Sequence, residues 1–247
     1  MDRQRTRRVG LARALSKLGY CSRSQAADLI RSGVVKLNGH IQRDPESPVD
    51  LQRDRITVAN EPAKAALKLY FMMNKPRGVV TTRSDERGRS TVYDLLPRDL
   101  PWIGPVGRLD KASEGLLLFT NDSEWAARLS DPESHLEKLY HVQIGCVGDE
   151  ALLQGITQGV RCGDVGVLRV IRASLLRSGA RNSWIEVALD EGKNRQIRRI
   201  FDAIGIEVLR LVRVAVGPLV LGNLAKGSCR PLKQEEKAAL DAALPRS

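Results

Sequence analysis

The chain has few of the residues that build metal centres, disulfide frameworks and membrane spans. Among its 247 residues are four cysteines and three histidines, with no Cys-x-x-Cys or His-Glu-x-x-His pattern. We therefore expect reduced thiols and no metal. No apolar run approaches 18 residues, so we expect no transmembrane helix and no membrane partner. The N-terminus lacks the apolar stretch of a secretory signal, which favours a cytoplasmic protein.

Acidic residues are also in deficit. The chain has 29 Asp and Glu against 40 Lys and Arg, a formal net charge of +11, which favours a polyanionic partner such as nucleic acid. Residues 1–60 carry twelve basic and six acidic residues, a net of +6 on about a quarter of the length. Charge runs are usually only solvated faces, but this concentration on one small segment favours phosphate contacts.

Residues 9–60 have the pattern of a compact helical-hairpin module. Leucines recur at helical spacing from Leu11, and a Ser-x-x-Gln capping box at Ser22 predicts a second helix. An Asn-Gly turn between two short runs, at 34–37 and 40–41, predicts a β-hairpin. Two short helices followed by a hairpin make a small independent domain.

The rest of the chain divides by composition. Residues 1–8 are basic and are predicted to form a flexible arm, whereas residues 61–68 have the composition of a linker. From 69 to 243, strand-like runs are numerous and helical stretches are short, among them an amphipathic pattern at 193–204. We therefore expect an α+β protein, in which the small module precedes a larger domain with a mainly antiparallel mixed sheet.

Three places in the larger domain hold polar residues that the pattern does not require. Asp110 lies between basic residues just before an apolar run, Tyr140 lies on a strand face predicted to be buried, and four basic residues open the 193–204 helix. Basic residues at a helix N-terminus oppose the helix dipole unless anions are nearby. Each place also has an ordinary interpretation: a turn carboxylate, a core tyrosine and a solvated helix face.

The order of these segments resembles a known enzyme family. Gly-Arg-Leu-Asp at 107–110, Lys-Leu-Tyr at 138–140 and Arg-Gln-Ile-Arg-Arg at 195–199 resemble the three signature segments of the pseudouridine synthases. The branch is that of RsuA, RluB, RluE and RluF, bacterial enzymes acting on ribosomal RNA. Residues 14–39 resemble the small RNA-binding domain first known from ribosomal protein S-four. The resemblance implies isomerisation of uridine without metal or cofactor: the N1–C1′ bond breaks, the base rotates, and C5 bonds to C1′.

The same resemblance implies three catalytic residues. Asp110 is the essential carboxylate, which either attacks the sugar or starts elimination at C2′. Tyr140 packs against the flipped base, and Arg198 pairs with Asp110. These roles are physically sound, because a fixed guanidinium keeps a carboxylate ionised in a dry pocket and a base in helical RNA must leave its stack to react.

Basic side chains in both parts of the chain are candidates for RNA contact. In the module they are Arg13, Lys17, Arg23, Arg31 and Lys36. In the larger domain they are Lys75, Arg77, Arg108, Lys193, Arg195 and Arg199. The expected partner is ribosomal RNA, either naked or in an assembling subunit, and the chain is expected to be monomeric. The alternative is a non-catalytic ribosome-associated RNA-binding or assembly factor that uses the same basic module.

Overall fold

The computed structural model describes residues 8–82 and 85–245, and the chain divides into two compact units. The first unit holds the chain up to Tyr70 with Arg98–Pro105 and Phe119–Ala127, and the second holds Phe71–Pro97, Val106–Leu118 and the chain from Arg128. The predicted arm falls outside the described residues except for Arg8. No helix in the described part has the length and hydropathy of a membrane span.

The first unit contains the predicted helical module. Helices α1 (Leu11–Lys17) and α2 (Arg23–Arg31) are present, and Ser22 and Gln25 form the predicted capping box at the start of α2. The predicted hairpin is β2 and β3, with Asn38 in the left-handed region at its turn. One sheet has the order β3 (His40–Ile41), β2 (Val35–Leu37), β5 (Ile56–Val58) and β6 (Glu61–Pro62), and β1 (Val9–Gly10) pairs with β4 (Pro48–Val49).

This unit has its own apolar core. Leu11 and Leu15 from α1 pack with Ile30 from α2 and Val35 from β2, and all four side chains are fully buried. The apolar faces of two short helices are thus covered by a small sheet, which leaves their basic residues at the surface. Helix α3 (Ser123–Ser130) begins within the same unit, where Glu124 pairs with Lys17 at 2.7 Å.

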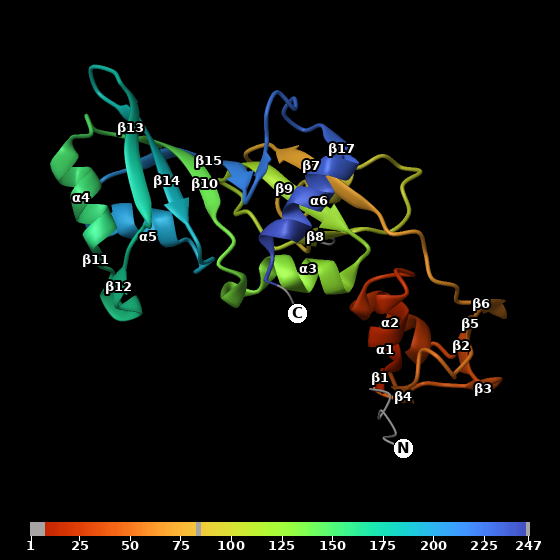
Figure 1. Cartoon of the computed structure of the whole chain (residues 1–247). Coiled ribbons are helices and arrows are strands. Elements are labelled where there is room, and N and C mark those ends of the chain that lie inside the picture. The colour runs from red at the N-terminus through yellow and green to blue at the C-terminus, as the bar shows by residue number, and fades with distance from the viewer. Residues whose placement is uncertain (1–7, 83–84, 246–247) are drawn as a thin grey trace. The chain divides into compact units, whose positions relative to one another are not determined.

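A nine-stranded mixed sheet forms most of the second unit (Figure 1). Its main order is β13 (Arg172–Ser178), β14 (Ser183–Leu189), β10 (Lys138–Ile144), β15 (Val208–Val216), β9 (Glu114–Thr120), β7 (Tyr70–Lys75) and β17 (Cys229–Pro231). The strands β16 (Leu219–Val220) and β8 (Gly104–Val106) add to β15 and β9. Strand β10 is antiparallel to both neighbours, whereas β9 and β15 are parallel, so the predicted α+β class with a mainly antiparallel mixed sheet is confirmed.

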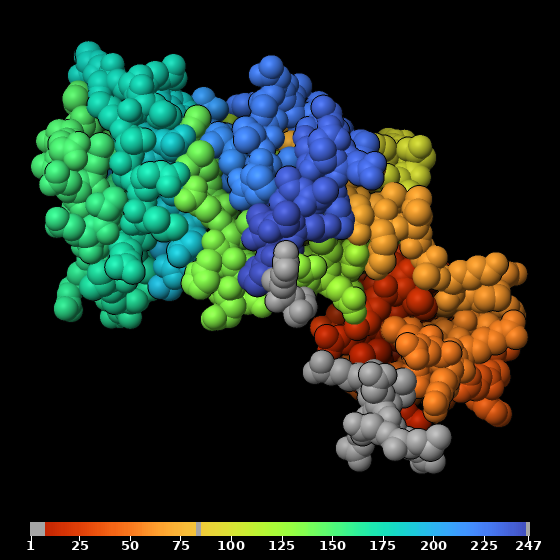
Figure 2. All heavy atoms as spheres, viewed as in Figure 1, coloured from red at the N-terminus to blue at the C-terminus, as the bar shows by residue number. Residues whose placement is uncertain are grey.

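Helices cover one face of the β14–β10 part of this sheet. Ile156 of α4 (Glu150–Gln158) and Phe201 of α5 (Gln196–Ala203) join Val142 and Ile185 of the strands in one core, and all four are fully buried. The space-filling view shows α4 and the β13–β14 hairpin at the surface of this unit (Figure 2). The remaining elements are α6 (Gln234–Ala243), the strands β11 (Val160–Arg161) and β12 (Val167–Leu168), and three 3₁₀ helices, η1 (Val92–Leu95), η2 (Pro132–Ser134) and η3 (Gly163–Val165).

Helix α5 begins later than the sequence pattern predicts. The periodicity predicts a helix over 193–204, but Arg195 has a φ of 53°, in the left-handed region, and is the N-cap residue. The helix therefore begins at Gln196, because a left-handed residue cannot continue a right-handed helix. Lys193 and Arg195 consequently lie in the preceding turn, and the prediction of a basic first helical turn is wrong for both.

Candidate active site

Asp110 lies on the loop between β8 and β9, and hydrogen bonds hold this loop in place. The Thr81 hydroxyl donates to the carbonyl oxygen of Leu109 at 2.7 Å, and the backbone N–H of Gly78 donates to the carbonyl oxygen of Lys111 at 2.8 Å. The residues on both sides of Asp110 are thus anchored to the segment that follows β7. These hydrogen bonds fix the position of the backbone at Asp110, and a reacting group needs a fixed position.

Lys75 also holds the same loop through a hydrogen bond. Its side chain is fully buried, and its ammonium donates to the carbonyl oxygens of Ser113, at 2.8 Å, and Pro76, at 3.0 Å. Burial lowers the pKa of Lys75 to about 8, against the opposing influence of the Glu114 and Asp110 carboxylates. The prediction that Lys75 contacts RNA is therefore wrong, because its charged end is enclosed by protein.

Arg198 supports the loop from the other side. This buried guanidinium donates to the carbonyl oxygens of Ala112, at 3.1 Å, and Val208, at 3.2 Å. Burial lowers its pKa, the charge of Arg195 lowers it further, and the Asp110 carboxylate opposes both effects. Its Nε atom has no hydrogen-bond partner among the described residues.

The predicted ion pair between Arg198 and Asp110 is not formed. The guanidinium within 4 Å of the carboxylate is that of Arg195, whose Nη1 lies 3.8 Å from Asp110 Oδ2. The terminal nitrogens of Arg198 instead donate to backbone carbonyls, and the left-handed conformation of Arg195 accompanies its position near Asp110. Both side chains of this pair are partly exposed, so the contact is a weak one in the free protein.

Tyr140 lies on β10, with Val187 and Arg213 as its cross-strand neighbours. The prediction that its strand face is buried is correct, since Val142 and Ile144 on that face are fully buried. Tyr140 itself packs against the edge of this core and is partly exposed. A ring with one side on the core and one side open can serve as a platform for another flat ring.

A cleft of about 610 Å³ contains Asp110 and Tyr140, and this volume is within the range of small-molecule sites. Three of the predicted RNA-contact residues line this cleft, and a fourth is hydrogen-bonded to a residue that lines it. Arg108, Lys193 and Arg195 line the cleft, whereas the Arg199 guanidinium donates to the side chain of Asn194, a cleft residue, at 3.4 Å. The cleft therefore combines one carboxylate, one aromatic ring and several cations.

Two further cations at this cleft, one buried and one partly buried, were not predicted from the sequence. Lys138 and Arg213 both line it, and the Arg213 Nε donates to the carbonyl oxygen of Leu116 at 2.8 Å. Burial lowers the pKa of Lys138, the charge of Arg213 lowers it further, and Asp190 opposes them. The alternation of residues along β15 could have predicted Arg213, because it places this residue on the same buried face as Leu211 and Ala215. Two cations held close together favour an anion between them.

The predicted RNA contacts of the module lie at its surface in different settings. Arg13 and Arg23 are exposed, whereas Arg31 pairs with Asp28 at 3.5 Å. Lys17 pairs with Glu124, and Lys36 donates to the Asn60 side chain at 2.9 Å. Arg77 in the second unit is also exposed. Across the ranges 8–82 and 85–245, no group of three or more His, Cys, Asp and Glu side chains could hold a metal ion, and the four cysteines are free.

Comparison with known proteins adds family relationships to this geometry. Residues 69–203 match the family model described as RNA pseudouridylate synthase, and residues 9–56 match the S4 domain model. An uncharacterized RNA pseudouridine synthase of Aquifex aeolicus (strain VF5) is 36% identical over 235 residues, covering 94% of this chain and 93% of its own. The ribosomal large subunit pseudouridine synthase B of Bacillus subtilis (strain 168) is 35% identical over 234 residues, covering 94% and 95%. A crystal structure of a pseudouridylate synthase aligns with a TM-score of 0.66 at 30% identity, covering 94% of this chain and 99% of that one.

Proposed function

Because the chain belongs to the RNA pseudouridylate synthase family and carries an S4 domain, we propose that it isomerises particular uridines of ribosomal RNA, with Asp110 as the essential carboxylate. The observation that carries the proposal is the cleft that Asp110 and Tyr140 share. The choice of ribosomal RNA is supported by the Bacillus subtilis relative, whose name specifies the large ribosomal subunit.

The reaction rearranges one nucleotide without adding or removing atoms overall. The N1–C1′ bond breaks, the uracil turns, and C5 bonds to C1′, after which C5 loses its proton and N1 gains one. An ionised Asp110 has two possible first steps: attack on C1′, or removal of the proton at C2′. Deuterium at C2′ slows the reaction only if removal of the C2′ proton is rate-limiting. An isotope effect at this position would therefore identify elimination.

Other cleft residues have distinct roles in this proposal. Tyr140 supports the uracil that has left the RNA stack, because a flipped base needs a flat apolar surface. The uracil carries negative charge once the N1–C1′ bond breaks heterolytically, and Lys138 and Arg213 supply positive charge from within the cleft. Arg198 acts as a positioning residue, since it holds the loop through Ala112 and does not line the cleft.

Release of tritium from C5 of uridine tests the proposal. The full chain is incubated with ribosomal RNA fragments tritiated at uridine C5, and wild type is expected to release the label. Asp110→Asn is expected to lower the rate at least ~10³-fold while RNA binding changes only a few fold, because the substitution is nearly isosteric. Asp149→Asn is the matched control, since that residue caps α4 and asparagine caps equally well.

Mapping pseudouridines in ribosomal RNA tests the substrate. A strain without the gene is expected to lack pseudouridine at one or a few positions, and the wild-type gene is expected to restore them while Asp110→Asn does not. A full set of ribosomal pseudouridines in the deletion strain would contradict the proposed substrate. Comparing naked RNA with partly assembled subunits as substrates in vitro then shows which form the enzyme uses.

A further inference from the structure

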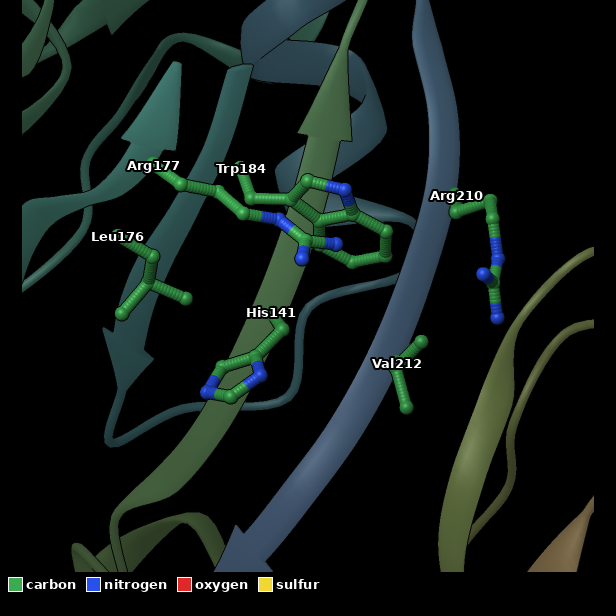
Figure 3. Close-up of a pocket in the computed structure, with 6 residues that line it drawn as sticks. All are labelled: His141, Leu176, Arg177, Trp184, Arg210 and Val212. Atoms are coloured by element: carbon green, nitrogen blue, oxygen red, sulfur yellow. The ribbon is translucent and has the colours of Figure 1, made fainter. Parts of the chain in front are cut away.

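The sheet face opposite the cleft carries a second hollow surface. Successive residues of a strand point to opposite faces, so Tyr140 faces the helix-covered core and His141 faces the other way. On that other face lies a groove of about 420 Å³, here called the Trp184 groove, drawn in Figure 3. It is lined by His141, Leu176, Arg177, Trp184, Arg210 and Val212.

The groove is organised by one row of side chains across four strands. Arg177 of β13 is registered with Trp184 of β14, Trp184 with Gln143 of β10, and Gln143 with Arg210 of β15. Three inter-strand steps give this row a length of about 14 Å. It therefore offers one aromatic ring with a guanidinium at each end, on a rigid sheet. In Figure 3 the Arg177 side chain lies across the indole of Trp184.

Both guanidiniums are close to the indole ring. The Cζ atoms of Arg177 and Arg210 each lie 5.4 Å from the centroid of the Trp184 ring. Arg210 is held in this position by two hydrogen bonds to the Glu114 carboxylate, at 3.0 and 3.1 Å. Arg177 is exposed, and its guanidinium contacts the Trp184 ring and takes part in no ion pair among the described residues. The row thus contains one fixed cation and one that is open to an anion.

The acidic groups near this row each have a hydrogen-bond partner on it or beside it. Glu114 is buried and bonded to both Arg210 and Lys226, whose cationic influence lowers its pKa although burial raises it. Glu186 lies 3.3 Å from the His141 imidazole. The exposed guanidinium of Arg177 is consequently the cation of this row that can bind an anion such as phosphate.

From this arrangement we propose that the Trp184 groove binds an unpaired segment of the RNA substrate, with a nucleobase stacked on the Trp184–Arg177 layer. Aromatic rings and guanidinium planes on a sheet face are the surface on which unpaired bases stack, and neighbouring cations bind the phosphates. Leu176 and Val212 supply apolar walls beside the ring. The surface is separate from the cleft, so the enzyme holds a second part of its RNA on the opposite face of the same strand, β10. The inference rests on the proposed function only in taking RNA as the partner.

Binding of short single-stranded RNA to the full chain tests this inference. The probe is a heptanucleotide of adenylate, and the control ligand is a fully paired RNA hairpin with a short loop. Trp184→Leu is expected to weaken binding of the heptanucleotide about 5- to 150-fold, the loss measured when a stacking aromatic is removed. Trp184→Phe keeps a stacking ring and is expected to bind within a few fold of wild type. Arg177→Gln is expected to weaken binding and to reduce its salt dependence.

The indole N–H resonance of Trp184 gives a local readout. It is assigned by its loss in Trp184→Phe, and the heptanucleotide is expected to shift it more than the hairpin does. An unshifted resonance together with unchanged affinity of Trp184→Leu overturns the inference. A shift that depends on protein concentration and not on RNA also overturns it, in favour of an interface between two copies of the chain. Repeating the titration in Asp110→Asn separates this binding from the chemistry, because either can fail without the other.

Discussion

Arg13 and Arg23 in the first unit, and Lys75 and Arg198 in the second, are the same kinds of residue in opposite settings. The first pair is exposed on helices whose other faces form a small core. The second pair is buried, and each side chain donates to a backbone carbonyl of the loop that carries Asp110. Exposed cations can reach phosphate, whereas the buried Lys75 and Arg198 bind backbone carbonyls of the same chain. A positive charge in the sequence therefore does not by itself identify a contact with RNA.

The buried cations have an energetic cost that the exposed ones avoid. Moving a charged group out of water costs several kcal/mol unless hydrogen bonds replace its hydration. Lys75 and Arg198 recover part of that cost from carbonyl oxygens at 2.8 to 3.2 Å. Shifted titration of such groups is common around functional sites, and here both surround one loop. The next four experiments test this contrast between the units.

The largest expected effect concerns the backbone where the Asp110 loop enters β9. Gly115 has a φ of 103°, and a Cβ atom there would lie 2.2 Å from the carbonyl oxygen of Arg213. Gly115→Ala is expected to lower the free energy of unfolding by more than ~4 kcal/mol, because strain and a backbone clash add. Gly39→Ala in the first unit, with a φ of 86° and no atom within 4 Å, should cost only about 1–2 kcal/mol. Urea unfolding measures both, and equal losses would contradict the contrast.

The next effect is the pH dependence of stability caused by Lys75. Its pKa is about 8 in the folded chain against 10.5 as its ordinary value. Between these pH values the unfolded chain binds more protons, so stability rises with pH, by up to about 3 kcal/mol from this group. Lys75→Met is expected to lack this rise, with the exposed Lys111→Met as the control for loss of one lysine. Parallel profiles of wild type and Lys75→Met from pH 7 to 10.5 would show that Lys75 is not buried as a cation.

A smaller effect separates the two arginines next to Asp110. Arg198→Gln removes the donors to Ala112 and Val208, and is expected to lower kcat about 100-fold with little change in KM, because the loop loses its position. Arg198→Lys should recover part of this rate, since an ammonium can reach one of the two carbonyls. Arg195→Gln removes an exposed pair at 3.8 Å and should change kcat only a few fold. Similar losses in Arg195→Gln and Arg198→Gln, measured by single-turnover tritium release, would refute the positioning role.

The smallest effect belongs to the exposed cations of the first unit. Arg23→Gln is expected to weaken RNA binding about 2- to 5-fold and to reduce the slope of log K against log salt by about 1, as for one phosphate contact. Its unfolding free energy should stay within about 0.5 kcal/mol of wild type. Lys75→Met should leave the salt slope unchanged. If Lys75→Met altered the salt slope and Arg23→Gln did not, Lys75 and not Arg23 would be the residue that contacts phosphate.

Local features of this fold were predictable from the sequence, and side-chain pairings were not. The capping box at Ser22 and the Asn-Gly hairpin follow from short-range chemistry, and both are present. The Arg198–Asp110 pair was wrong because the outcome depends on a left-handed φ at Arg195, which no periodicity reveals. The sequence also does not show that Lys75 is buried and bonded to the carbonyl oxygen of Ser113, because the two residues lie 38 positions apart. Which of several adjacent cations meets a carboxylate is decided by tertiary packing.

The sequence distances of the loop contacts have a consequence for how the protein matures during synthesis. The buried residues of the first unit's core all lie between positions 11 and 58, with Val9 and Ala63 packed against them, so this core can form early on the ribosome. The Asp110 loop, by contrast, needs Lys75, 38 positions before Ser113, and Arg198, 86 positions after Ala112. Contacts between residues so far apart in sequence form late, because the entropy of closing a long loop is lost before the contact stabilises the chain. A nascent chain can therefore fold its S4 domain long before the loop that carries Asp110 is set, because that loop lacks its contact with Arg198 until residue 198 has been made.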